Sequence, residues 1–144
     1  MMASFEEELE RSGRLIYRNA GVSMRPLIKQ DRDILIISKP EGRLKKYDIP
    51  LYKRDGNRYV LHRIVKVREN DYVILGDNCL RKEYGITDDR IIGVLTSLVR
   101  NGKEIDLNGT GYKLYSRFWY FIYPVRVIFM RARIVAGKIK RKLK

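Results

Sequence analysis

The sequence has little of what disulfide frameworks and metal sites require. Its 144 residues include one cysteine, Cys79, and one histidine, His62. A single cysteine excludes an internal disulfide framework, and this pair is too small for a zinc site, which needs three or four protein ligands. The sequence therefore predicts no metal site, and we expect no cofactor.

Long hydrophobic runs are also missing. The most apolar stretch, residues 118–130, is interrupted by Arg126 and falls short of the ~20 residues that a membrane-spanning helix needs. The first residues are acidic, where a secretory signal is basic and then apolar. We therefore expect no signal peptide and no N-terminal anchor, and a protein that is cytoplasmic or peripherally attached to the cytoplasmic membrane.

Acidic residues are absent after Asp106. The chain has 31 Lys and Arg against 17 Asp and Glu, a net charge of +14, and ten of the positive charges follow Asp106. The length fits one domain. We divide it into residues 1–106, of ordinary charge, and a basic aromatic tail, residues 107–144, which we expect to be helical. Aromatic side chains beside Lys and Arg are typical of a helix at an anionic membrane surface. They also fit a stripe packed on the core, and both interpretations stay open.

Short β-strands dominate residues 14–106. Ser4 and Glu7 form a capping box, which predicts a short helix over residues 4–12. Asp55-Gly56 lies between the extended runs 47–53 and 58–67, and Asn101-Gly102 follows the run 91–99; both pairs predict hairpins. The runs 34–37 and 72–75 are apolar and rich in β-branched residues. We predict a mainly β fold, an antiparallel sheet or partly open barrel.

Three residues are candidates for chemistry. Ser23 lies in a predicted turn between Gly21 and Pro26, His62 lies on the predicted second strand of the Asp55-Gly56 hairpin, and Asp77 follows the run 72–75. Each has a plain structural interpretation, because turns favour such residues and a lone histidine on a strand is usually structural. Chemically, a histidine held neutral is a general base near pH 7, and a carboxylate would orient it.

The order of these segments resembles the signal peptidase I superfamily, which includes the LexA-like self-cleaving repressors. The matching residues are Gly-x-Ser-Met-x-Pro at 21–26, Asp48-Ile49, His62-Arg63, Gly-Asp-Asn at 76–78 and Ile92-Gly93. The His-Arg pair is similar to the archaeal and endoplasmic-reticulum branch. The resemblance covers about residues 14–100 and implies a serine endopeptidase that cleaves a peptide or preprotein leader after small side chains. It implies Ser23 as the nucleophile and His62 as the base.

The chain departs from the family pattern after Gly-Asp-Asn, where the Asp-Asp pair of that branch is missing. Asp77 is our first choice for the acidic partner of His62, with Asp88 and Asp89 behind it. Lys66 is an alternative base, predicted on the same strand face as His62. We expect Cys79 to be unreactive, because a nearby carboxylate raises a thiol pKa. Tyr52 is expected to pack on the sheet.

Two other classes of function compete with a peptidase. A nucleic-acid-binding or regulatory module on the same fold would use the basic tail, although that tail lacks a compact reading element and there is no room for a helix-turn-helix before Ser23. An inactive scaffold would keep the fold without the chemistry. We favour the peptidase because of the ordered motifs, and expect nucleic acid not to be the partner.

Overall fold

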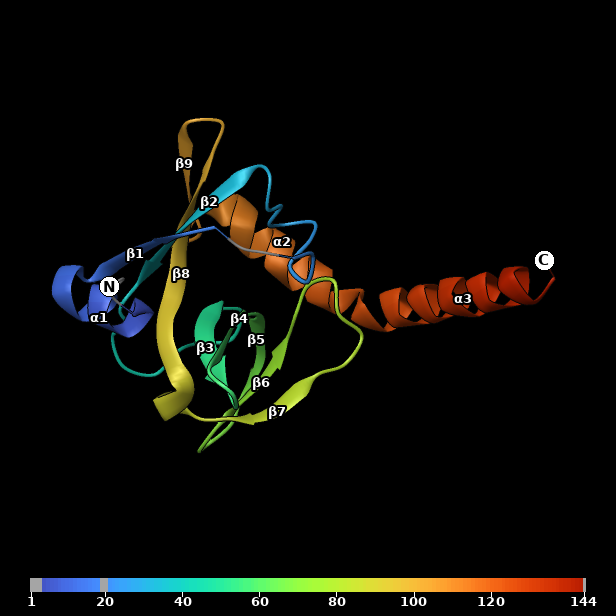
Figure 1. Cartoon of the computed structure of the whole chain (residues 1–144), viewed down its shortest axis with the longest axis horizontal. Coiled ribbons are helices and arrows are strands. Elements are labelled where there is room, and N and C mark those ends of the chain that lie inside the picture. The colour runs from blue at the N-terminus through green and yellow to red at the C-terminus, as the bar shows by residue number, and fades with distance from the viewer. Residues whose placement is uncertain (1–3, 19–20, 144) are drawn as a thin grey trace.

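The structure is a computed structural model that describes residues 4–18 and 21–143 (Figure 1). Its elements in chain order are α1 Phe5–Ser12, β1 Arg14–Tyr17, β2 Asp33–Ser38, β3 Pro50–Arg54, β4 Arg58–Leu61, β5 Arg63–Val67, β6 Tyr72–Leu75, β7 Glu83–Ile86, the 3₁₀ turn Asp88–Arg90, β8 Ile91–Arg100, β9 Lys103–Asp106, α2 Thr110–Phe121 and α3 Tyr123–Lys142.

The strands form two antiparallel sheets. The larger has the order β1-β2-β8-β3-β4, with β9 also paired to β8, and the smaller has the order β5-β6-β7. No closed barrel forms among the described strands, and the coarse prediction of a mainly antiparallel β fold is confirmed. The capping box and both hairpins also form as predicted, with the hairpins joining β3 to β4 and β8 to β9.

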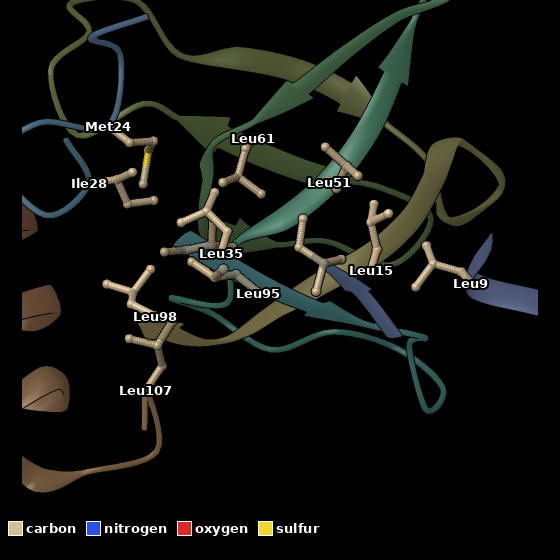
Figure 2. Packing of buried hydrophobic residues seen from close by; sticks show 12 residues of the cluster. Leu9, Leu15, Met24, Ile28, Leu35, Leu51, Leu61, Leu95, Leu98 and Leu107 are labelled. Atoms are coloured by element: carbon tan, nitrogen blue, oxygen red, sulfur yellow. The ribbon is translucent and has the colours of Figure 1, made fainter. Parts of the chain in front are cut away.

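The largest apolar cluster packs against the larger sheet (Figure 2). Leu35 and Ile37 of β2 and Leu51 of β3 are completely shielded from solvent. Each such side chain contributes about 1.5–3 kcal/mol through its transfer out of water. Gly93 lets β8 approach its neighbour, because a methyl group there would lie 2.5 Å from Ile37 Cγ2. This contact gives the Ile92-Gly93 segment a structural role.

His62 does not lie on a strand, which corrects the prediction. β4 ends at Leu61 and β5 begins at Arg63, so His62 is the single residue at which the chain leaves the larger sheet for the smaller. The alternation expected from Val60 to Lys66 also fails, because residues 61–65 are all buried and the β5–β6 register shifts between Ile64 and Lys66. Burial on both sides replaces the two-faced pattern of a surface strand.

The tail is helical, as expected, and its two helices differ. Leu107 joins the main core and Ser116 of α2 is buried, so the packed body continues past residue 106. α3 extends away from both sheets (Figure 1). Among the residues that the structure describes, no helix combines the length and apolarity that crossing a membrane requires.

Candidate active site

A turn at residues 21–27 carries Ser23. Met24 and Ile28 anchor this turn, because both are fully buried in the main core (Figure 2). The backbone N–H of Asn78 donates to the Ser23 carbonyl at 2.8 Å, and the Asn78 side chain donates to the Val22 carbonyl at 3.1 Å. The Gly-Asp-Asn segment therefore holds the serine turn in place, which explains why the two motifs occur together.

Gly76 brings the serine turn and His62 together. A methyl group built on Gly76 would lie 2.8 Å from the Ser23 carbonyl oxygen and 3.0 Å from His62 Cδ2. Both groups therefore lie on the same side of Gly76, and only a residue without a side chain fits between them. The fold thus places two of the three predicted site residues, Ser23 and His62, next to each other.

His62 is buried, with 8% of its surface exposed. Burial, and after it the positive charge of Arg54, lower the pKa of His62 from 6.5 to about 4, although the negative charges of Glu83 and Asp77 act in the opposite direction. The imidazole is therefore neutral at pH 7. A neutral imidazole is the form that accepts a proton from a nucleophile.

Tyr52 and Glu83 form the polar surroundings of the His62 ring. Tyr52 Oη lies 3.4 Å from His62 Nδ1 and donates to Glu83 Oε2 at 3.3 Å. Because the Tyr52 proton is directed to Glu83, its oxygen accepts from Nδ1–H, which leaves Nε2 as the unprotonated nitrogen. Nε2 is bonded to Cδ2, the ring atom that lies beside Gly76.

Arg54 holds Glu83 in this network. Its Nη2 donates to Glu83 Oε2 at 2.5 Å and its Nε donates to both carboxylate oxygens. Burial raises the pKa of the Tyr52 phenol well above its ordinary value, so this group is a neutral donor at pH 7. Sequence reasoning assigned Tyr52 to sheet packing and missed Glu83. The register of the Asp55-Gly56 hairpin holds a signal, since it pairs Tyr52 with Val60, two residues before His62.

Asp77 is not the hydrogen-bond partner of His62, which corrects our first choice. Both of its carboxylate oxygens accept from Arg63, at 2.7 and 2.8 Å, and Oδ2 also accepts from Tyr115 Oη at 2.9 Å. Arg63 and Asp77 are both buried, so the pair is an internal ion pair. A buried carboxylate binds the strongest hydrogen-bond donor near it. Here that donor is the guanidinium of Arg63, which donates two hydrogen bonds.

The second choices, Asp88 and Asp89, also have other partners. Asp88 accepts from Tyr72 Oη and pairs with Arg43, and Asp89 accepts from the Thr87 hydroxyl. These contacts lie on the 3₁₀ turn before β8 and involve no group of the His62 network.

The tail helices hold the loop that contains Asp77. Trp119 Nε1 and Arg126 Nη1 each donate to the Asp77 carbonyl at 2.8 Å. Tyr115 stacks on Trp119 with 5.8 Å between ring centroids, and the Arg126 guanidinium lies 4.3 Å from the Trp119 ring. Because Asn78 in the same loop binds the Ser23 carbonyl, α2 and the start of α3 stabilise the position of the serine turn indirectly. The sequence shows that the tail is rich in aromatic residues, but it does not show which of them contact this loop.

The Lys66 amine and the Cys79 thiol, the other two groups considered for chemistry, lie in different parts of the structure. Lys66 is exposed toward the end of β5. Cys79 lies near the Ser23 turn, with Sγ 4.0 Å from the Ser23 carbonyl, and burial raises the pKa of its thiol. A protonated thiol is a poor nucleophile, so Ser23 is the better candidate. Within residues 4–18 and 21–143, Cys, His, Asp and Glu form no group of three that would hold a metal ion.

No protein-family model matches the chain, and neither the curated proteins nor the solved structures provide a match.

Proposed function

We propose that the protein is a serine endopeptidase in which Ser23 is the nucleophile and His62 the general base. The observation that carries the proposal is the juxtaposition of Ser23 and a buried, neutral His62 across Gly76. The ordered motifs that resemble signal peptidase I support the same interpretation.

The reaction has two halves. His62 Nε2 takes the Ser23 Oγ proton while Oγ bonds to the carbonyl carbon of the scissile peptide. His62 then gives that proton to the leaving amine as the C–N bond breaks, which leaves an ester on Ser23. A water molecule, deprotonated by His62, attacks the ester and restores the Ser23 hydroxyl. Among the described hydrogen bonds none joins Ser23 Oγ to His62, and such catalytic bonds often tighten only when substrate binds.

Tyr52 and Glu83 take the orienting part that a carboxylate has in the Ser-His-Asp arrangement. Tyr52 Oη accepts a hydrogen bond from Nδ1–H, which fixes the tautomer, and donates one to Glu83, which fixes the phenol. When His62 becomes protonated during the reaction, the Glu83 charge stabilises the imidazolium across the phenol. These residues are positioning residues, because neither contacts the scissile bond in this scheme.

The substrate in this proposal is an extended peptide or preprotein leader. β4 is an edge strand of the larger sheet and ends directly before His62. A peptide that adds to such an edge gains main-chain hydrogen bonds and brings its own backbone toward the base. Small side chains before the scissile bond follow from the family resemblance.

A serine-directed fluorophosphonate probe tests the assignment. The folded protein should become labelled, Ser23→Ala should lose the label, and His62→Gln should label far more slowly because the hydroxyl is no longer activated. Ser12→Ala is the matched control, because Ser12 is an exposed serine on α1 that has no part in the site. It should label like the native protein.

Two results would contradict the proposal. Labelling of Ser23→Ala at the native rate would place the reactive group elsewhere. Absence of labelling in a folded native protein, together with no cleavage of peptides that contain small residues, would favour the non-catalytic module or the inactive scaffold.

A further inference from the structure

The tail helices carry an apolar stripe that no other part of the described structure covers. Its members recur at intervals of three and four residues, which places them on one side of a helix. Its most exposed large member is Phe121, with 81% of its surface exposed. The stripe consists of Leu114, Phe118, Phe121, Val125, Ile128, Ala132, Val135 and Ile139, all of them exposed.

α2 and α3 are separated by Ile122 alone, and the chain bends between them (Figure 1). The backbone N–H of Ile122 donates to the Phe118 carbonyl and that of Arg126 donates to the Ile122 carbonyl, so helical hydrogen bonds lead into and out of the junction. The three- and four-residue spacing of the stripe is kept across it. The residues of α2 that hold the Asp77 loop, Tyr115 and Trp119, lie off this stripe and face the body. Among the described residues, no member of the stripe belongs to a buried apolar cluster of the body.

Positive charge surrounds the stripe. Residues 107–144 contain ten Lys and Arg and no Asp or Glu. On the body, Lys46 and Lys82 border the hollow that Phe118 and Phe121 line, and their ammonium groups lie over the Tyr120 ring at 5.5 Å. An apolar surface with a uniformly cationic border matches acyl chains beneath anionic headgroups.

A second copy of the chain fits this surface poorly. The spacing of the stripe resembles the seam of a coiled coil, whose flanking positions pair opposite charges. Here every charged residue on α2 and α3 is positive, so two such helices would repel along their length. Nucleic acid would satisfy the charge but leave the apolar stripe in water.

We propose that the apolar stripe of α2 and α3 binds the surface of an anionic bilayer. α3 lies in the interfacial plane, its apolar stripe enters the boundary between headgroups and acyl chains, and its Lys and Arg side chains contact the lipid phosphates. The twenty residues of α3 give a contact about 30 Å long. Each apolar side chain and each nearby cation adds to the binding free energy. The proposal does not depend on peptidase activity.

Vesicle flotation of the full chain tests this surface. The protein should float with vesicles of phosphatidylglycerol and phosphatidylcholine in equal parts, more weakly with phosphatidylcholine alone, and less as salt is raised. Ile139→Glu should weaken flotation by about tenfold or more, because it removes an apolar group that would enter the bilayer.

Ile134→Glu is the matched control. It makes the same chemical and charge change on the same helix, at 48% exposure compared with 53% for Ile139. Residue 134 is five positions earlier, which places it about 140° around the helix and off the stripe. It should therefore reduce flotation much less than Ile139→Glu.

Five results would overturn the proposal. These are no flotation with anionic vesicles, equal flotation with anionic and neutral vesicles, or equal losses in the two glutamate variants. The fourth is a dimer by light scattering that Ile139→Glu dissociates while vesicles stay unbound, which would make the stripe a contact between copies. Salt-sensitive gel shifts of DNA without vesicle binding would likewise replace the bilayer with nucleic acid.

Discussion

At the scale of single residues, the candidate site depends on groups that have no chemistry of their own. Gly76 contributes only the space between Ser23 and His62, and Met24 contributes only its buried anchor. Burial of His62 keeps it neutral, and Tyr52 selects which of its nitrogens is free. In the proposed mechanism, packing therefore prepares Ser23 and His62 before a substrate binds.

Gly76→Ala tests the close approach. Its methyl group would lie 2.6 Å from Cys79 Sγ, 2.8 Å from the Ser23 backbone oxygen and 3.0 Å from His62 Cδ2, so the serine turn or the backbone of the Gly-Asp-Asn segment must shift. Such a displacement of the nucleophile or the base should reduce the rate of probe labelling by on the order of a hundredfold. Gly111→Ala is the control, because a methyl group there meets no atom within 4 Å. Native-like labelling by Gly76→Ala would show that the approach does not matter for reactivity.

The pH profile tests the state of His62. Its pKa is lowered from 6.5 to about 4, so the base stays neutral as the pH falls through 6 and 5. The acid limb of kcat/KM, which reports the free enzyme, should therefore have its midpoint near pH 4 and not near 6.5. A midpoint at or above 6.5 would contradict a buried neutral base.

Tyr52→Phe tests the orienting hydrogen bond. The variant keeps the ring but leaves His62 Nδ1 without its partner, so the productive tautomer and ring orientation are no longer held. We expect kcat to fall by about tenfold or more with little change in KM. Tyr59→Phe also loses a tyrosine-to-glutamate hydrogen bond, to Glu6, and should keep the native kcat. Equal kcat values in the two variants would remove Tyr52 from the mechanism.

At the scale of elements, the junction between β4 and β5 determines where His62 lies. The chain crosses between sheets at one residue, and that residue is His62. Directly after it, Arg63 pairs with Asp77, and α2 closes over the pair with Tyr115. The predicted catalytic carboxylate is therefore part of the joint that fastens β5, the Gly-Asp-Asn loop and α2 together.

Asp77→Asn separates the structural from the catalytic role. The substitution leaves Arg63 as a buried charge without its partner, which should lower the free energy of unfolding by about 3–5 kcal/mol. Urea denaturation measures this loss. Asp71→Asn breaks a comparable two-bond contact to Arg68 at an exposed turn and should change stability little. An Asp77→Asn protein of native stability that has lost its activity would restore Asp77 as the partner of His62.

At the scale of the whole molecule, the positive charge is separated from the site. The body carries the serine turn, the base and the internal ion pair, whereas the excess of Lys and Arg lies on the helix that extends from it. α2 connects the two parts, because it packs on the Asp77 loop and continues into α3. A lipid-bound α3 would thus hold the body beside the bilayer without altering its fold.

A chain that ends at Arg133 tests this separation. The removed residues of α3 are almost all exposed, so the free energy of unfolding should stay within about 0.5 kcal/mol of the native value. Trp119→Ala should destabilise the protein, since Trp119 binds the Asp77 carbonyl. Thermal or urea unfolding of both variants checks the prediction. A large loss of stability in the shortened chain would show that the end of α3 supports the body.

The sequence by itself determined the local structure and the two principal candidates. The capping box, the hairpin pairs and the β-branched runs act over a few residues, so α1, β2, β6, β8 and both hairpins could be predicted from short windows. Ser23 and His62 were selected by motif order. The concentration of charge after Asp106 was likewise readable directly.

Only the tertiary structure decided which groups surround His62. Tyr52 and Arg54 come from β3 and Glu83 comes from β7, and nothing local to either strand specifies a contact with an imidazole. Asp77 could not be assigned from the sequence either, because His62 and Arg63 are adjacent and a carboxylate binds whichever donor the fold turns toward it. Burial, which sets the pKa of His62 and leaves the stripe of α2 and α3 uncovered, is a property of the folded chain, since it depends on how distant segments pack.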